Sequence, residues 1–315
     1  MAITAGQVKE LREMTGAGMM ECKKALTETN GDMEASVEWL RKNGAMKAVK
    51  KASRIAAEGL CFVKSEDDKK AAVVEVNSET DFVAQNEKFR AYVDQVAAQA
   101  LHTSAKDLDA FLAEPWEADN AKTVNDALVE MIAVISEKLS IRRFEQVEAT
   151  EGFVSTYSHG GGRIGVIIEA KTDNATDEVK EAVRNVAMQV AAMSPKYISE
   201  DEISEEEREH EKEILLAQAI KENEELPEEK RKPQEILEKM LIGRLKKQFK
   251  EICLNDRIYV KAEDGKQTVQ EYLNQVAKAA GTTLSVKKFV RYEVGEGIEK
   301  KQENFAEEVM AQAKG

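Results

Sequence analysis

The chain has 315 residues, of which 42% are hydrophobic and 33% are charged, a balance typical of a globular protein with two or three domains. Its formal net charge is −13, although residues 1–54 carry ten Lys/Arg against seven Asp/Glu. Binding to duplex nucleic acid depends on clustered cations that neutralise phosphates, so this acidic body argues against a specific nucleic acid partner.

Residues 1–54 predict a small bundle of three helices followed by a linker. Thr4 and Gln7 have the spacing of a capping box, which opens the first helix. Two further short helices follow, and Asn43-Gly44 is the expected end of the third. The basic tract 47–54 then leads away as a linker or as a helical extension. Because so short a bundle buries little core, we expect it to lean on another surface.

The next part of the sequence predicts an α+β core in which one unit, strand-strand-helix, occurs twice. In each unit two hydrophobic runs flank a turn and precede an amphipathic helix. The apolar helix positions are Phe89, Val93, Val96, Ala97 and Ala100 in the first unit, and Val179, Val183, Val186, Val190 and Ala191 in the second. A further helix from Val124 to Leu139 is expected to cover the first sheet. We assign 55–145 to an N-subdomain of the core, and 146–199 with 253–295 to a C-subdomain.

Residues 200–252 predict a protruding pair of antiparallel helices, a coiled-coil insertion between the two parts of the C-subdomain. The stretch 200–232 holds fourteen Asp/Glu and six Lys/Arg, but its apolar residues keep helical spacing. The expected seam consists of Ile203, His210, Ile214, Ala217 and Ile220, facing Leu237, Leu241, Leu245 and Phe249. A helix over 269–280 and a strand over 284–294 follow, and a short helix near Phe305–Met310 is expected in a C-terminal module, 296–315.

Familiar catalytic and metal-binding motifs are absent from the sequence. It has three histidines, no GxSxG, HExxH or P-loop pattern, and three cysteines (Cys22, Cys61 and Cys253) that stand far apart. We therefore expect no catalytic residue, no metal, no cofactor, no directly bound nucleotide and packed, reduced thiols. The first residues lack a signal-peptide pattern and no stretch of about 18 apolar residues occurs, which indicates a cytoplasmic protein without a membrane partner.

The segment from Asn77 to Val83 follows a predicted strand and precedes a helix. Phe82 at an exposed loop tip would be suited to anchor a partner. Alternatively, Thr80 or Asp81 caps the helix and the ring of Phe82 packs underneath it. The residue pattern alone favours this second interpretation.

Two other segments have both a binding interpretation and an ordinary one. Adjacent helix positions cannot face the same way, so one of Met19 and Met20 is expected in the core and the other on the surface. An exposed Met beside Arg12 and Lys23 suits a protein-binding surface, because the flexible thioether adapts to a partner. The glycine-rich turn 158–163, which contains His159, could hold a phosphate. Such glycines usually indicate only a turn whose backbone needs positive φ angles.

Four stretches of the sequence, in order, resemble the elongation factor Ts family. They are Leu11-Arg12 with Thr15 through Leu26, where Glu21 replaces the commoner Asp; Glu75-Val76-Asn77 with Thr80-Asp81-Phe82-Val83; Tyr157 with His159 through Val166; and Arg291 through Ile298. The resemblance covers nearly the whole chain, and four long matches in order are far more specific than one short motif.

The resemblance implies an N-terminal head like a ubiquitin-associated domain, a two-part α+β core, a projecting helical hairpin and a terminal helical module. It also implies a guanine nucleotide exchange factor that acts by binding. Such a factor binds elongation factor Tu in its GDP-bound and nucleotide-free forms, promotes release of GDP and is displaced when GTP binds. The family further includes the possibility of a homodimer within a larger complex with Tu, and it leaves the role of the acidic hairpin open.

Particular residues acquire roles through this resemblance. In the family, the positions matching Arg12, Met19, Met20 and Lys23 contact a helix of the GTPase domain of Tu. Those matching Thr80-Asp81-Phe82-Val83 enter that domain, with the Asp and Phe wedged between its helices, so that its magnesium and phosphate sites distort. His159 matches a histidine held to lie at the same interface. The resemblance therefore reverses the preference for a packed Phe82.

Three alternatives remain open from the residues themselves. The head could serve as a ubiquitin-associated-like module that binds other chains without exchange activity. An enzyme could use Glu79, Asp81 and His159 as acid and base, which requires these side chains to converge on a pocket. The basic tract 47–54 is the only support for an RNA-binding protein, whose weak binding modest salt would abolish.

Overall fold

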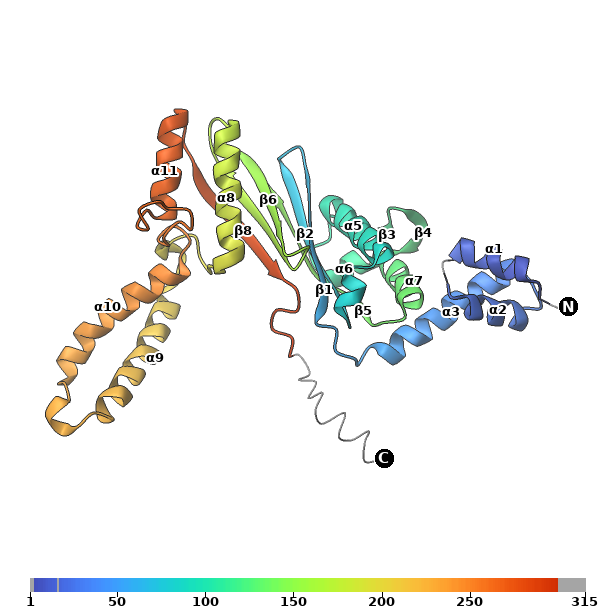
Figure 1. Cartoon of the computed structure of the whole chain (residues 1–315), viewed down its shortest axis with the longest axis horizontal. Coiled ribbons are helices and arrows are strands. Elements are labelled where there is room, and N and C mark those ends of the chain that lie inside the picture. Colours follow the sequence, from blue (N-terminus) through green and yellow to red (C-terminus); the bar gives the residue numbers. More distant parts are fainter. Residues whose placement is uncertain (1–2, 16, 300–315) are drawn as a thin grey trace.

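The computed structural model describes residues 3–15 and 17–299 of the chain. Over this range the architecture is mixed α+β, as predicted, with a helical head at one end, two three-stranded sheets in the middle and a helical hairpin that projects from the other end (Figure 1). The helix predicted near Phe305–Met310 lies outside the described residues. Within them, each helix is too short or too polar to cross a lipid bilayer.

Three helices form the head: α1 (Ala5–Thr15), α2 (Met19–Glu28) and α3 (Met33–Lys51). The predicted capping box is present, because the Thr4 N–H donates to Gln7 Oε1 at 3.0 Å and the Gln7 N–H donates to Thr4 Oγ1 at 3.3 Å. The small core of the head consists of Val8, Leu11, Ala17, Cys22, Ala25 and Leu26.

The predicted end of the third helix at Asn43-Gly44 is wrong, because α3 continues to Lys51 and most of the basic tract is helical. Gly44 is buried where α3 crosses α7 (Val124–Ile135). A β-carbon at Gly44 would lie 3.5 Å from the β-carbon of Ala133. The glycine thus allows two helices to approach closely instead of terminating one of them.

Two antiparallel sheets form the middle of the molecule, in the orders β1-β2-β5 and β6-β7-β8. The strands are β1 (Glu58–Glu66), β2 (Lys70–Ser78), β5 (Leu139–Glu148), β6 (Phe153–His159), β7 (Ile164–Lys171) and β8 (Ser285–Glu293). The repeated strand pairs and the last strand were predicted, but β5 was not. Leu139 was assigned to the preceding helix, whereas α7 ends at Ile135, Ser136 adopts a left-handed conformation and Leu139 opens the strand.

The two sheets pack face to face, and helices cover their outer faces. Cys61, Val73, Ile167 and Val290 are among the buried residues between the sheets. The covering helices are α5 (Glu87–His102) and α7 on the first sheet, and α8 (Asp177–Met193) and α11 (Val269–Ala280) on the second (Figure 1). A short helix and a small hairpin connect α5 to α7: α6 (Leu108–Ala113), β3 (Pro115–Trp116) and β4 (Asp119–Thr123). The predicted apolar positions of α5 and α8 are all buried, which confirms them.

The projecting hairpin consists of α9 (Glu205–Glu224) and α10 (Gln234–Ile252), flanked and joined by the short 3₁₀ turns η1 (Glu200–Glu202) and η2 (Glu228–Lys230). The predicted seam is confirmed on α10, where Leu237, Leu241 and Phe249 are buried. On α9 it is wrong, because Ile214 and Ile220 are exposed while Ala219 is buried. Apolar residues occur on several faces of α9, so packing against α10 decides which face is buried.

A buried carboxylate joins the two halves of the core. Glu75 on β2 is fully buried and accepts hydrogen bonds from Arg142 at 2.9 Å, Arg143 at 2.6 Å and the Gly295 N–H at 2.8 Å. Burial by itself raises the pKa of Glu75, but the hydrogen bonds from Gly295, Asn77 and the two arginines outweigh it and hold the pKa below its usual value. The ionised carboxylate therefore ties the first sheet to the segment that follows β8.

Candidate functional site

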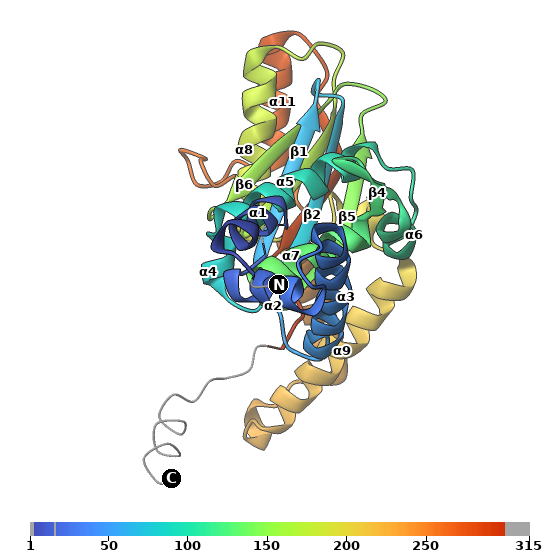
Figure 2. The ribbon, with the colours of Figure 1, turned by 90° about the vertical axis from the view of Figure 1, so that its right-hand side faces the viewer.

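The strand β2 leads into a helix of one turn, α4 (Asp81–Ala84). Val83 and Ala84 are buried in the core beneath the first sheet's helices, whereas Asp81 is exposed and the side chain of Phe82 is 84% exposed. The interpretation that Phe82 packs under the helix is therefore wrong, although Thr80 does occupy the N-cap position. Seen from the head, α4 lies at one edge of the molecule, opposite β4 and α6 (Figure 2).

Glu137, in the connection between α7 and β5, holds the residues just before α4. Its carboxylate accepts hydrogen bonds from the Glu79 N–H at 3.1 Å, the Thr80 N–H at 3.0 Å and the Thr80 hydroxyl at 2.7 Å. The Glu79 carboxylate in turn accepts from the Lys138 N–H at 2.5 Å and lies 3.2 Å from Arg54. The loop is therefore bound both to the α7–β5 connection and to the chain that follows α3.

His159 lies at the end of β6 in a turn made by three glycines with positive φ angles. Its Nδ1 lies 3.0 Å from the Tyr157 hydroxyl, and its ring is exposed. Gly162 has a φ of 105°, and a β-carbon there would lie 2.8 Å from the Leu60 side chain, so this position requires glycine. Arg163 pairs with Glu58 at 3.2 Å, which weakens the phosphate-binding interpretation of the turn because its cation is already engaged.

Arg90 connects the glycine turn to α4. Its Nη1 donates to the carbonyl oxygen of Ala84 at 3.0 Å and to that of Gly161 at 3.3 Å. Phe82 and His159 are 77 positions apart in the sequence, yet one side chain links the segments that carry them. Arg90 thus fixes the glycine turn relative to α4.

The head carries the second set of predicted contact residues, Arg12, Met19, Met20 and Lys23. All four are exposed, with Met19 58% and Met20 75% exposed. The expectation that one methionine enters the core is wrong, because Ala17, Cys22, Ala25 and Leu26 already fill the interior on that side. Among the described residues, no hydrogen bond or ion pair joins these four side chains to α4 or to the glycine turn.

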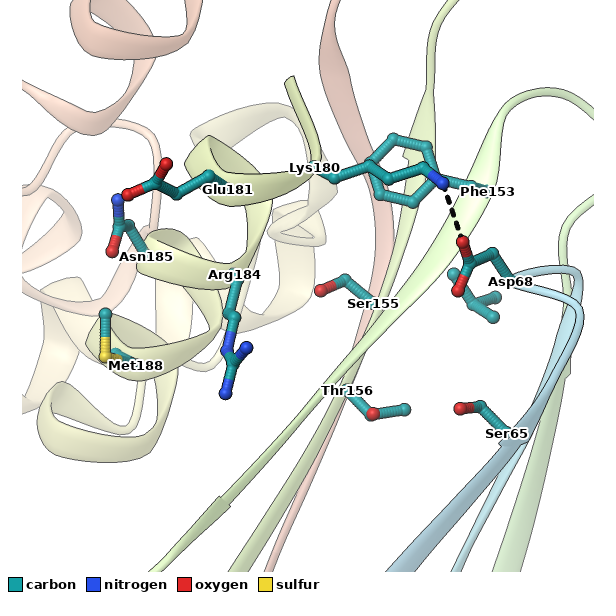
Figure 3. A pocket seen from close by; sticks show the side chains of 11 residues that line it. Ser65, Asp68, Phe153, Ser155, Thr156, Lys180, Glu181, Arg184, Asn185 and Met188 are labelled. Atoms are coloured by element: carbon teal, nitrogen blue, oxygen red, sulfur yellow. Dashed lines mark hydrogen bonds and ion pairs between the residues drawn. The ribbon is translucent and has the colours of Figure 1, made fainter. Parts of the chain in front are cut away.

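Two cavities lie away from α4. One, of about 810 Å³, lies between the head and the elements α7 and β4, and its lining includes Met20, Trp39 and Val129. The other, of about 610 Å³, lies between α8, β6 and the β1–β2 hairpin, where Lys180 pairs with Asp68 at 2.8 Å and Arg184 lies beside Ser155 and Thr156 (Figure 3).

Neither of these two cavities is lined by Glu79, Asp81 or His159, the three residues that the enzyme interpretation places in a common pocket. Over residues 3–15 and 17–299, no cluster of three or more His, Cys, Asp or Glu side chains could hold a metal ion. All three thiols are buried, as predicted, and burial raises the pKa of Cys253 to about 11.

Sequence reasoning missed Glu137, Arg90 and Arg54. The role of Glu137 could be found only from the pairing of β5 with β2. This pairing places Leu139 opposite Ser78 and so brings Glu137 beside Thr80. Because Leu139 was assigned to the preceding helix and no strand was predicted after it, this proximity could not be inferred.

The fold defines a mixed α+β protein whose core consists of two stacked three-stranded sheets with helices on their outer faces. Comparison with known proteins specifies the class further. The family model described as "Elongation factor TS" matches residues 79–296. Elongation factor Ts of Clostridioides difficile (strain 630) is 50% identical, covering 99% of this chain and 99% of its own length. That of Clostridium perfringens (strain SM101 / Type A) is 49% identical, covering 98% of each. The chain belongs to the elongation factor Ts family and is a translation elongation factor.

Proposed function

We propose that this chain is a guanine nucleotide exchange factor for elongation factor Tu, as the family resemblance implies. The observation that supports it best is α4, where Phe82 is 84% exposed while the next two residues are buried. A large exposed ring on a well-anchored backbone is suited to insert into a partner, because little of its own structure must become ordered on binding.

The roles within the matching segment differ from residue to residue. Asp81 and Phe82 form the wedge that enters the GTPase domain of Tu. Val83 is buried and Thr80 is bound to Glu137, so these two hold the wedge in place rather than contacting the partner. His159 adds a contact beside the wedge, and the head adds a separate one through Arg12, Met19, Met20 and Lys23.

The mechanism is a competition between two ligands of Tu. The factor and GDP bind Tu antagonistically, and linkage requires each to weaken the equilibrium binding of the other by the same factor. Disturbing the magnesium site removes a local positive charge from the phosphates, so GDP leaves faster. GTP then binds the nucleotide-free form and displaces the factor. No covalent bond is made or broken, and the chain itself holds no nucleotide.

The test is stopped-flow release of a fluorescent GDP from a cognate elongation factor Tu at fixed magnesium. We expect a large acceleration with the wild-type chain and its loss with Asp81→Ala/Phe82→Ala. Ile258→Ala is a matched control, since Ile258 is 53% exposed but lies in the second subdomain away from α4. No acceleration by the wild-type chain would reject the exchange function and favour the head as a binding module for other chains.

A further inference from the structure

The connection between α7 and β5 contains one carboxylate, Glu137, which accepts hydrogen bonds from Glu79 and Thr80, the two residues just before the wedge. We propose that Glu137 is a positioning residue that sets the direction of Asp81 and Phe82, and this inference rests on the function proposed above. Glu137 does not touch the partner in this proposal. It acts through Glu79 and Thr80.

The geometry of these contacts constrains two consecutive peptide groups. Glu137 Oε2 accepts the N–H groups of Glu79 and Thr80, and Oε1 accepts the Thr80 hydroxyl. The peptide planes on either side of Glu79 are thereby oriented toward one oxygen atom. Since Asp81 follows directly, this carboxylate fixes the start of α4, while buried Val83 and the Arg90 hydrogen bond to Ala84 hold its other end.

The helix α4 cannot set its own orientation. It has four residues, and a single isolated turn is not stable because its nucleation is unfavourable. The Thr80 hydroxyl oxygen occupies the N-cap position but accepts no hydrogen bond from α4, and its proton is donated to Glu137. The orientation must therefore come from outside the helix.

The chemistry at position 137 favours a carboxylate over an amide. An ionised carboxylate offers only acceptors and can receive all three donors, whereas Gln would direct an NH₂ group at one of them. The reverse contact, from the Lys138 N–H to the Glu79 carboxylate, completes a reciprocal pair of links between the two segments. Loss of Glu137 should leave the wedge attached but variable in direction. Binding to the partner must then order the wedge, which costs binding free energy.

The experiment compares Glu137→Ala and Glu137→Gln with the wild-type chain in the GDP-release assay. We expect Glu137→Ala to raise the concentration for half-maximal acceleration by about tenfold, and Glu137→Gln to raise it less. Glu145→Ala is the matched control, because Glu145, like Glu137, is a half-buried carboxylate, but it lies on β5 and pairs with Lys288 at 2.7 Å, away from the wedge. It should behave as the wild type does.

A double-mutant cycle separates positioning from a general structural effect. If Glu137 acts only through the wedge, Glu137→Ala should have almost no further effect on exchange when Phe82 is already Ala. If the double variant instead shows the product of the two single-variant effects on exchange, the two residues act independently and the inference is overturned. Amide hydrogen exchange gives a readout that does not depend on Tu: protection of the Glu79 and Thr80 N–H groups should fall in Glu137→Ala while that of β2 is kept.

Failure of the inference and failure of the proposed function give different results. If wild type accelerates release, Phe82→Ala does not, and Glu137→Ala equals the wild type, the inference is overturned and the function stands. If the wild type is inactive with a cognate Tu, the function is rejected and the inference falls with it. Unchanged protection of Glu79 and Thr80 in Glu137→Ala would overturn the inference in either case.

Discussion

At the scale of single residues, burial distinguishes two phenylalanines that lie seven positions apart, one available for binding and one that stabilises the fold. Phe82 is 84% exposed on α4, whereas Phe89 is 0% exposed on α5. Burial of a Phe side chain contributes about 1.5–3 kcal/mol to folding, a stabilisation that Phe82 does not receive. An exposed ring of this size on a fixed backbone is available for a partner.

We therefore expect Phe82→Ala to change the free energy of unfolding by less than about 0.5 kcal/mol. Phe89→Ala, the matched control, should lower it by about 3–5 kcal/mol because it leaves a cavity in the core. Chemical denaturation followed by circular dichroism measures both. A loss of several kcal/mol in Phe82→Ala would show that the ring belongs to the core and would remove it from the proposed wedge.

At the scale of secondary-structure elements, the crossing of α3 and α7 connects the head to the core. Gly44 lies at the closest approach, with Ala133 and Val129 of α7 facing it. The same crossing fixes how the exposed methionines of α2 are presented relative to the rest of the molecule. An ion pair between Arg41 and Glu130, with an N–O distance of 3.4 Å, lies across the same pair of helices.

Substitutions at Gly44 should depend steeply on side-chain size. Gly44→Ala adds a β-carbon at ordinary contact distance, and alanine is favoured over glycine within a helix by about 1 kcal/mol, so we expect unchanged or slightly higher stability. Gly44→Leu should cost about 1–3 kcal/mol through overpacking and expose α3 to protease. Thermal unfolding and limited proteolysis give the measurements, and equal behaviour of the two variants would contradict the close packing.

At the scale of the whole molecule, Glu75 and its two arginines join the halves of the core. Arg143 also lies over the ring of Tyr292, 4.1 Å from its centroid, and pairs with Glu296 at 3.0 Å. The surface that carries Phe82 comes from the first half and the turn that carries His159 from the second. Their relative placement thus depends on contacts between the sheets.

Glu75→Gln should lower the free energy of unfolding at pH 7 by about 3 kcal/mol, because it leaves buried donors and two arginines without their anion. The pKa of Glu75 is lower in the folded chain than its unfolded value of about 4.3. The carboxylate therefore stabilises the fold above about pH 4.3, and this contribution is lost as the pH falls through the folded-state pKa.

Denaturant titrations of the wild type and Glu75→Gln between pH 7 and pH 3 measure this effect. The difference between the two proteins should be largest at neutral pH and should shrink in acid. Glu145→Gln, which breaks a surface ion pair, should cost less than about 1 kcal/mol. A difference for Glu75→Gln that does not vary with pH would show that shape at this position, and not charge, stabilises the fold.

The sequence by itself determined the features whose signals are local. The capping box at Thr4, the helix over 269–280 and the apolar face of α5 were predicted because helix period and capping residues are read within a few positions. Four ordered stretches also indicated the family. The sequence did not decide the direction of Phe82, since a cap with a packed ring and a cap with an exposed ring use the same residues.

Only the tertiary structure decided the features that depend on distant partners. Asn43-Gly44 has the pattern of a helix end, yet Ala133 explains why a glycine is needed within a continuous helix. The strand that begins at Leu139 follows so closely on α7 that its apolar residues continue the helical pattern. Glu137 meets Thr80 and Glu75 meets Gly295 across 57 and 220 positions, and such proximity arises from sheet pairing and packing, which no local pattern records.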